Sequence, residues 1–264
     1  MKKLPTLGFI GTGAITKALV TGLCRRAADV PYPIVISPRN AKNAAQLKAD
    51  YPDQITIAEN NQAVVDTADW VILAVHPNIG EDVCRSLRFR SDHKVINLMF
   101  DKSIEQIRDF IGEVDTILFM IPLTFNAFAD GPIVLYPAND EAAAIFGHIG
   151  RIIFADDPDQ ALVYDTFSGC VTSLFAVMDS LIRWSESKGL SSDDAATYIT
   201  RFFNAVSQEA SSLDRGGIHT MATVSLENGI NMQALNHIGH LGGFEAWQGA
   251  MENIYTRLTS TQSE

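Results

Sequence analysis

The sequence is poor in basic residues. Twenty Lys and Arg stand against 31 Asp and Glu among 264 residues, which gives a formal net charge of −11 and an isoelectric point near 4.9. Proteins that bind the phosphate backbone of nucleic acids neutralise it with clustered Lys and Arg. This sequence has no such cluster. We therefore expect no nucleic-acid partner.

Cysteines and long apolar runs are also scarce. The three cysteines, Cys24, Cys84 and Cys170, are odd in number and far apart, so they indicate neither a disulfide framework nor a metal site. No apolar stretch is long enough to cross a bilayer, and the first one is broken by Pro5 and by glycines, which argues against a signal peptide. We expect a cytoplasmic protein with no membrane partner and no metal.

Apolar residues make up 47% of the chain, enough for two domains that each have a core. Residues 7–16, Leu-Gly-Phe-Ile-Gly-Thr-Gly-Ala-Ile-Thr, predict a buried strand, a tight turn and the start of a helix. Gly11 allows the sharp turn. Gly13, which has no Cβ, lets a pyrophosphate approach the N–H groups at the positive end of the helix. The predicted cofactor-binding residues of this turn are Gly11, Thr12, Gly13, Ala14 and Ile15.

The glycine motif is incomplete, because Thr16 stands at its third glycine position. A Gly-x-Gly sequence alone also fits an ordinary turn. Its place between a predicted strand and a predicted helix favours dinucleotide binding.

The segment after the second predicted strand, residues 32–37, indicates the cofactor type. An NAD enzyme places Asp or Glu there to bind the ribose hydroxyls, whereas this chain has Ser37, Pro38, Arg39 and Asn40. Hydroxyl, guanidinium and amide groups all donate to a 2′-phosphate, and Arg39 would do so through two bonds. We predict NADP(H); the alternative is a solvated loop arginine.

A strongly apolar strand over residues 69–75 ends at His76, on the side of the sheet edge where the nicotinamide is expected. His76 is either a ligand contact and proton donor or a polar loop residue. Strands at 94–98, 116–121, 131–136 and 151–155 alternate with helices. This alternation predicts an α/β fold with a Rossmann-type parallel sheet in a dinucleotide-binding domain, residues 1–157.

The strand signals stop at residue 158, and long amphipathic helices follow. We expect one long helix over 160–188 with a possible break at Ser168-Gly169, and a loop over 226–232. The all-helical domain, residues 158–264, is too small for a large core of its own, which favours a homodimer formed through these helices.

The sequence resembles the pyrroline-5-carboxylate reductase superfamily nearly from end to end. Residues 8–19 resemble the opening of that family, and residues 37–40 stand where it holds the 2′-phosphate. Asn61 matches an asparagine that touches the cofactor ribose. The family's Ala-Val-Lys-Pro, whose backbone borders the cofactor, is here Ala74, Val75, His76 and Pro77. The resemblance implies an NAD(P)H-dependent enzyme with a helical dimerisation domain that reduces a cyclic imine.

The departures from the family fall on the substrate site. The family's Met-Pro-Asn-Thr-Pro is Ile-Pro-Leu-Thr-Phe at 121–125, and its substrate loop is Leu-Glu-Asn-Gly-Ile-Asn-Met at 226–232. Glu227 would repel a carboxylate, so we expect an altered pocket that does not favour proline-like imino acids. The resemblance implies substrate binding by Ser168, Gly169, Gly229, Ile230 and Asn231.

The leading hypothesis is hydride transfer from NADPH to a C=N or C=O carbon of a small substrate. The candidate proton donors are Asn231, Thr124 and His76; the alternative for Asn231 is a loop-capping role. Reduction of a C=N bond is favoured, because an iminium is already electrophilic. One alternative is an inactive NADP-binding sensor or assembly protein. Another is a 3-hydroxyacid-type dehydrogenase, for which no catalytic lysine is evident in the first long helix of the second domain.

Overall fold

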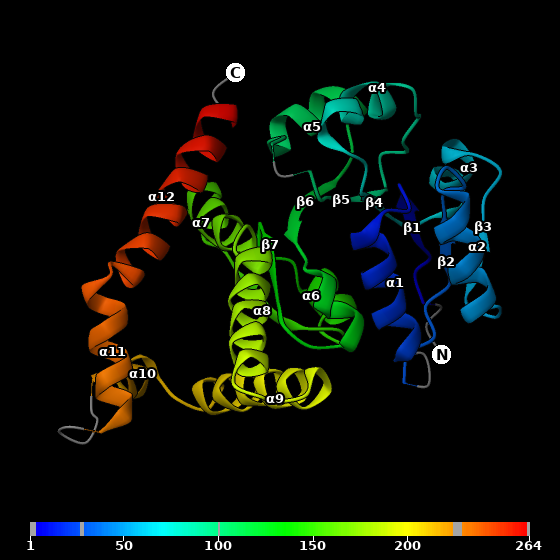
Figure 1. Ribbon diagram of the computed structural model, residues 1–264. Helices are drawn as coiled ribbons and strands as arrows, with labels where there is room; N and C mark the ends of the chain where they lie inside the picture. Colours follow the sequence, from blue (N-terminus) through cyan, green and yellow to red (C-terminus); the bar gives the residue numbers. More distant parts are fainter. Residues whose placement is uncertain (1–3, 27–28, 100, 224–228, 263–264) are drawn as a thin grey trace. The chain divides into compact units, whose positions relative to one another are not determined.

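The computed structural model describes residues 4–26, 29–99, 101–223 and 229–262 (Figure 1). The chain divides into two compact units. The first comprises Met1–Asp165 and Tyr255–Glu264, and the second Thr166–Ile254. The expected domain limits, 1–157 and 158–264, stay a prediction.

One eight-stranded sheet organises the first unit (Figure 1). Its strands lie in the order β3-β2-β1-β4-β5-β6-β7-β8. They are β1 (Leu7–Ile10), β2 (Ile34–Ile36), β3 (Ile55–Ile57), β4 (Trp70–Leu73), β5 (Lys94–Asn97), β6 (Thr116–Ile121), β7 (Pro132–Tyr136) and β8 (Arg151–Phe154). The first six strands are parallel, with β1 between β2 and β4 at the point where the strand order reverses. This arrangement confirms the predicted fold class.

Helices cover both faces of the sheet, because the strands are apolar on both sides. In β1, Leu7 and Phe9 belong to the core on one face and Ile10 to the core on the other, as the twofold period of a strand requires. The first core is covered by α1 (Ala14–Arg25), α2 (Ala41–Asp50) and α6 (Asp140–Phe146). The second is covered by α3 (Asn61–Thr67), α4 (Gly80–Arg85) and α5 (Ile104–Ile111).

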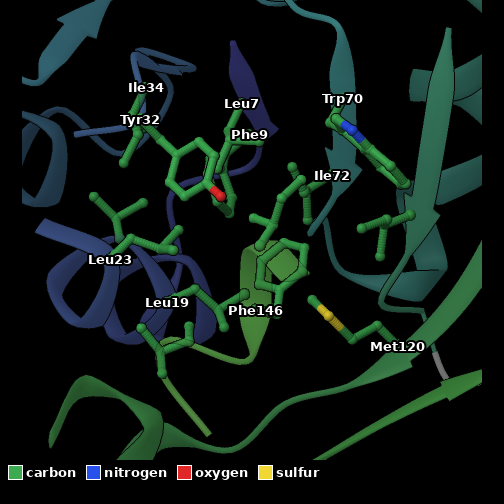
Figure 2. Close-up of a cluster of buried hydrophobic side chains, with 14 of the residues drawn as sticks. Leu7, Phe9, Leu19, Leu23, Tyr32, Ile34, Trp70, Ile72, Met120 and Phe146 are labelled. Atoms are coloured by element: carbon green, nitrogen blue, oxygen red, sulfur yellow. The ribbon is translucent and has the colours of Figure 1, made fainter. Parts of the chain in front are cut away.

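Figure 2 shows the first of these cores. Trp70 and Ile72 from β4 share this core with Leu19 of α1 and Phe146 of α6, and all four side chains are fully buried. The indole N–H of Trp70 donates to Glu141 Oε1 at 3.1 Å, so the one polar atom of this large side chain is satisfied.

The expectation of a parallel sheet throughout is wrong at its far end. β7 runs antiparallel to β6, with Phe119 opposite Tyr136, and β8 is parallel to β7. The link from β6 to β7 contains only the short 3-10 helix η2 (Thr124–Phe128). A parallel crossover needs about a dozen or more residues, usually with a helix, so this short link reverses the chain direction.

The remaining helices are those expected to follow residue 158. They are α7 (Pro158–Ser168), α8 (Val171–Ser187), α9 (Ser192–Ser211), α10 (Arg215–Thr223), α11 (Ile230–His240) and α12 (Gly243–Gln262). The expected break at Ser168-Gly169 is confirmed. Gly189, at φ +100°, follows the end of α8, and the Ser191 hydroxyl accepts from Asp194 N to cap α9.

The loop expected over 226–232 is wrong for its last three residues. α11 begins at Ile230, after Gly229, whose extended backbone serves as the N-cap. The residues that follow include Met, Gln, Ala and Leu, all good helix formers. Residues 226–228 lie outside the described residues.

One helical stretch, Pro158–Ser187, is long and apolar enough to be considered as a membrane span, with a mean hydropathy of 1.4 in its most apolar window. It is divided into α7 and α8 at Gly169-Cys170. It also carries Asp159, Asp165 and Asp179, which are costly inside a bilayer. The stretch is therefore weak evidence for a membrane span.

One buried histidine makes stability depend on pH. His93 is fully buried, its Nδ1 accepts from Arg90 N at 2.9 Å, and its ring meets Phe89 edge to face. Burial, and secondarily the charge of Arg90, lower the pKa of His93 below its ordinary value of 6.5. The folded protein thus holds this imidazole neutral at a pH where the unfolded chain protonates it.

We predict that the free energy of unfolding falls as pH is lowered from about 7.5 to about 5.5, because unfolding then takes up a proton at His93. The His93→Gln variant removes this contribution, and its pH slope should be shallower by up to roughly 1.4 kcal/mol per pH unit. Urea denaturation at several pH values measures both slopes. His219→Gln, at an exposed position of α10, is the matched control. Equal slopes for His93→Gln and the unmodified protein would contradict the prediction.

Candidate functional site

The turn between β1 and α1 requires glycine at position 11. Gly11 has φ +97°, and a Cβ placed there would lie 2.4 Å from the carbonyl oxygen of Ala74, the residue after β4. Both the backbone conformation and the close contact exclude a side chain. The carboxyl ends of β1 and β4 therefore meet directly at this turn.

Gly13 differs from Gly11, because it faces open space. A Cβ at Gly13 would meet no atom within 4 Å, and no side chain caps α1, whose N-cap it is. By contrast, side chains cap the starts of α2 and α3. Asn40 Oδ1 accepts from Asn43 N in α2, and Asn60 Oδ1 accepts from Ala63 N in α3. The first N–H groups of α1, with no acidic residue in the first turn, are left to bind an anion.

Three hydroxyl groups hold this turn from behind. Thr16 Oγ1 donates to the Gly11 carbonyl at 2.7 Å, so the residue that replaces the third glycine stabilises the turn. Gly11 N donates to Ser37 Oγ at 2.9 Å, and Thr12 Oγ1 donates to the Ser37 carbonyl at 2.7 Å. The Ser37 side chain is fully buried and faces the turn. It therefore shapes the turn here, and its predicted contact with a phosphate stays a prediction.

A hollow of about 470 Å³ lies in front of this turn, at the carboxyl edge of the sheet. Three segments predicted from the sequence form it together: Gly11–Gly13 after β1, Arg39 after β2, and Ala74–His76 after β4. Asn40, whose amide was predicted to donate to the 2′-phosphate, also lines it, as do Ala41 and Ile79, which the sequence did not single out. Ala14, Ile15, Pro38, Asn61 and Pro77 adjoin these segments or begin a helix at the same edge without lining the hollow themselves.

Two polar side chains of the hollow are available to a ligand. Arg39 is exposed, and none of the residues that the structure describes forms an ion pair with it. His76 Nδ1 accepts from Asn78 N at 3.3 Å, so in a neutral ring the proton is assigned to Nε2, which can donate. The hollow thus offers a ligand the Arg39 guanidinium after β2 and the His76 Nε2–H donor after β4.

Thr124 is exposed and begins η2, three residues after the end of β6 at Ile121. It does not line the hollow. The loop around it is held by the buried Asn126, whose side chain accepts from Leu123 N at 2.7 Å and donates to Asp130 O at 2.9 Å.

The other predicted substrate residues lie in the second unit and its helices. Ser168 ends α7, and Gly169 follows it, with Ile254 Cδ1 2.8 Å from where a Cβ would stand. Gly229 precedes α11, whose first turn begins with the exposed Ile230 and Asn231. These residues thus lie at the junction of α7 and α8 and at the start of α11, and their roles stay predictions.

The chain is similar to known proteins in its sequence. The family described as NADP oxidoreductase coenzyme F420-dependent matches residues 6–100. Pyrroline-5-carboxylate reductase of Haemophilus influenzae is 27% identical over 181 residues, 65% of this chain and 65% of that protein. The pea enzyme of the same name, from Pisum sativum, is 26% identical over 161 residues, 58% of each chain. The match thus spans somewhat less than two thirds of these relatives.

The fold is shared over nearly the whole length. A pyrroline-5-carboxylate reductase from Coxiella burnetii superposes with a TM-score of 0.81 at 21% identity, covering 98% of this chain and 99% of the other. The Plasmodium falciparum pyrroline carboxylate reductase, solved with NADP bound, gives 0.84 at 17% identity and 98% coverage of both chains.

The doubly wound sheet and the hollow at its switch point define the first unit as a Rossmann-type nucleotide-binding domain, followed by helices. In sequence, the chain is similar to the NADP oxidoreductase family over residues 6–100 and to the pyrroline-5-carboxylate reductases over about two thirds of its length.

The same substitution at the two glycines of the turn should change stability by very different amounts. Gly11→Ala should lower the free energy of unfolding by about 1–3 kcal/mol or more, because the positive φ and the Ala74 carbonyl both oppose a Cβ. Gly13→Ala should leave stability within about 0.5 kcal/mol, since its φ is −81° and the space is open. Urea denaturation of both variants measures these changes in the free energy of unfolding. Equal effects would show that the turn is not as described.

Proposed function

We propose that the protein is an NADPH-dependent oxidoreductase that transfers hydride to a C=N bond of a small substrate, a cyclic imine related to pyrroline-5-carboxylate. The observation that carries the proposal is the uncapped start of α1, with open space at Gly13, in a hollow that Arg39 and Ala74–His76 complete. The relatives named pyrroline-5-carboxylate reductase supply the reaction type.

The residues present fit NADP(H). Its pyrophosphate would lie on the N–H groups of Gly13, Ala14 and Ile15, where no acidic side chain opposes it. Arg39 would bind the 2′-phosphate beside Pro38, and Asn61 would lie near the ribose. Ala74, Val75 and Pro77 would border the nicotinamide. When bound, the cofactor supplies the hydride.

The chain's own residues would orient the substrate and supply a proton. His76 is the best supported donor, because it lines the hollow and its Nδ1 is already occupied by Asn78 N. Thr124 of η2 and Asn231 of α11 remain further candidates. An iminium needs no proton from the enzyme before hydride attack, so the absence of a strong acid among these three groups fits C=N reduction better than C=O reduction.

The test is oxidation of NADPH and NADH by the purified protein with pyrroline-5-carboxylate, its six-membered homologue and a panel of cyclic imines and keto acids. We expect turnover of a cyclic imine with a preference for NADPH. Turnover of 3-hydroxy or keto acids alone would replace this proposal with the dehydrogenase alternative. Tight NADPH binding with no turnover on the panel would favour the binding-protein alternative.

Arg39→Ala should raise the dissociation constant of NADPH about 10- to 100-fold, the loss of a charge-assisted contact of roughly 1.5–3 kcal/mol, and leave that of NADH nearly unchanged. Fluorescence titration with both nucleotides measures this. Arg201→Ala, at an exposed position of α9, is the control. An unchanged NADPH constant would remove Arg39 from the phosphate site.

The helical domain would bind substrate through Ser168, Gly169, Gly229, Ile230 and Asn231, and pair with a second copy. Its helices leave large apolar side chains exposed, among them Phe175 at 66%, Tyr198 at 66% and Phe202 at 54%. Surfaces of this kind are usually covered by a partner. We place this homodimer in the cytoplasm.

Sedimentation velocity should give a dimer, and Phe202→Glu should shift it toward monomer by placing a charge in an apolar interface. Gln208→Glu, also exposed on α9 and equal in added charge, should leave the dimer intact. A monomeric unmodified protein would remove the dimer from the proposal.

A further inference from the structure

A hydrogen bond ties the turn after β1 to the start of α2. Asn43, in the first turn of α2, donates from its side-chain Nδ2 to the carbonyl oxygen of Thr12 at 2.9 Å. A backbone carbonyl can only accept, so the amide nitrogen and not the amide oxygen of Asn43 faces it. Asn43 thus joins two of the segments that line the hollow, Gly11–Gly13 and Arg39–Ala41.

Asn43 is itself held in place by its helix. Its backbone N–H donates to Asn40 Oδ1 at 3.2 Å, which caps α2. Its side chain is partly buried, and the next residue, Ala44, is buried in the core that α1 and α2 cover together (Figure 1). The amide therefore approaches Thr12 from a fixed element and not from a loop.

The bond to Asn43 decides which way the next N–H group points. The Thr12–Gly13 peptide is trans, and in a trans peptide the C=O and N–H groups point in opposite directions. The Gly13 N–H therefore points away from Asn43. Among the residues with a described position, none accepts a hydrogen bond from it. Gly13 lines the hollow, so this donor is left for a ligand.

The glycine at position 13 makes this orientation easy to lose. Reversal of the Thr12–Gly13 peptide changes ψ of Thr12 and φ of Gly13, and glycine adopts positive φ about as readily as negative φ. Gly13 has φ −81°, and a Cβ there would meet no atom within 4 Å, so packing does not restrain it. A reversed peptide would turn the Thr12 carbonyl oxygen toward a bound phosphate, which repels it.

We propose that Asn43 is a positioning residue for the cofactor, which holds the Thr12–Gly13 peptide so that the Gly13 N–H donates to the pyrophosphate. This inference rests on the proposed function, because it needs a dinucleotide in the hollow. Asn43 acts through the peptide and not on the 2′-phosphate. Its effect should therefore differ from that of Arg39 and be the same for NADPH and NADH, which share the pyrophosphate.

The binding test separates the two phosphate groups of the cofactor. ADP-ribose carries the pyrophosphate and lacks the 2′-phosphate, whereas 2′-AMP carries the 2′-phosphate and lacks the pyrophosphate. In isothermal titration calorimetry, Asn43→Leu should raise the Kd of ADP-ribose about five- to tenfold, the loss of one restraining hydrogen bond. The Kd of 2′-AMP should change by less than about twofold. Arg39→Ala should show the opposite pattern.

Two further variants separate positioning from a general effect on the fold. Asn43→Gln keeps an amide donor and should restore most of the affinity for ADP-ribose. Gln46→Leu makes the same kind of change at an exposed position of α2 and is the matched control. Equal weakening of ADP-ribose and 2′-AMP in Asn43→Leu would reduce Asn43 to a support of the fold and overturn the inference. An unchanged Kd of ADP-ribose would overturn it too.

The intact cofactors give an independent readout. Asn43→Leu should raise the Kd of NADPH and of NADH by the same factor, so the preference between them is kept. A loss confined to NADPH would assign Asn43 to the 2′-phosphate and contradict the positioning role. Fluorescence titration with both nucleotides measures this.

The two proposals fail in different ways. If imines are reduced with NADPH and Asn43→Leu leaves ADP-ribose binding unchanged, the proposed function stands and the inference is wrong. If no imine is reduced but ADP-ribose binds in an Asn43-dependent manner, the positioning role stands and the imine reaction is wrong. If the unmodified protein does not bind ADP-ribose, the inference is overturned.

Discussion

The first unit depends on the close contact between Gly11 and the Ala74 carbonyl. This contact joins the carboxyl ends of β1 and β4, the two strands between which the strand order of the sheet reverses. Nothing larger than a hydrogen atom fits between them. The hydrogen bonds of Thr16, Ser37 and Thr12 then fix the turn from inside the protein, which leaves its outer side, at Gly13, without a capping group. The hollow is the consequence of this one-sided arrangement.

The elements that carry strong local signals could be predicted from the sequence. The alternation of apolar strands with helices predicted the doubly wound sheet. Glycines predicted the turn after β1 and the end of α8, because glycine adopts backbone conformations that other residues avoid. The same reasoning collected Gly11–Gly13, Arg39 and Ala74–His76 at one edge, since carboxyl ends of parallel strands meet there.

What escaped prediction depends on contacts between distant residues. The reversal of β7 follows from how a short link packs, which strand periodicity does not encode. The sequence could not reveal that the Ser37 hydroxyl points inward to Gly11 N.

Thr16 carries a lesson for engineering this chain. A designer who completed the glycine motif would replace Thr16 with the glycine that the motif has at its third position. In this protein the Thr16 hydroxyl is the partner of the Gly11 carbonyl, so that repair would leave a part-buried acceptor unpaired at a cost of about 1–3 kcal/mol. Thr16 therefore stabilises the turn, and the residue of the standard motif would weaken it.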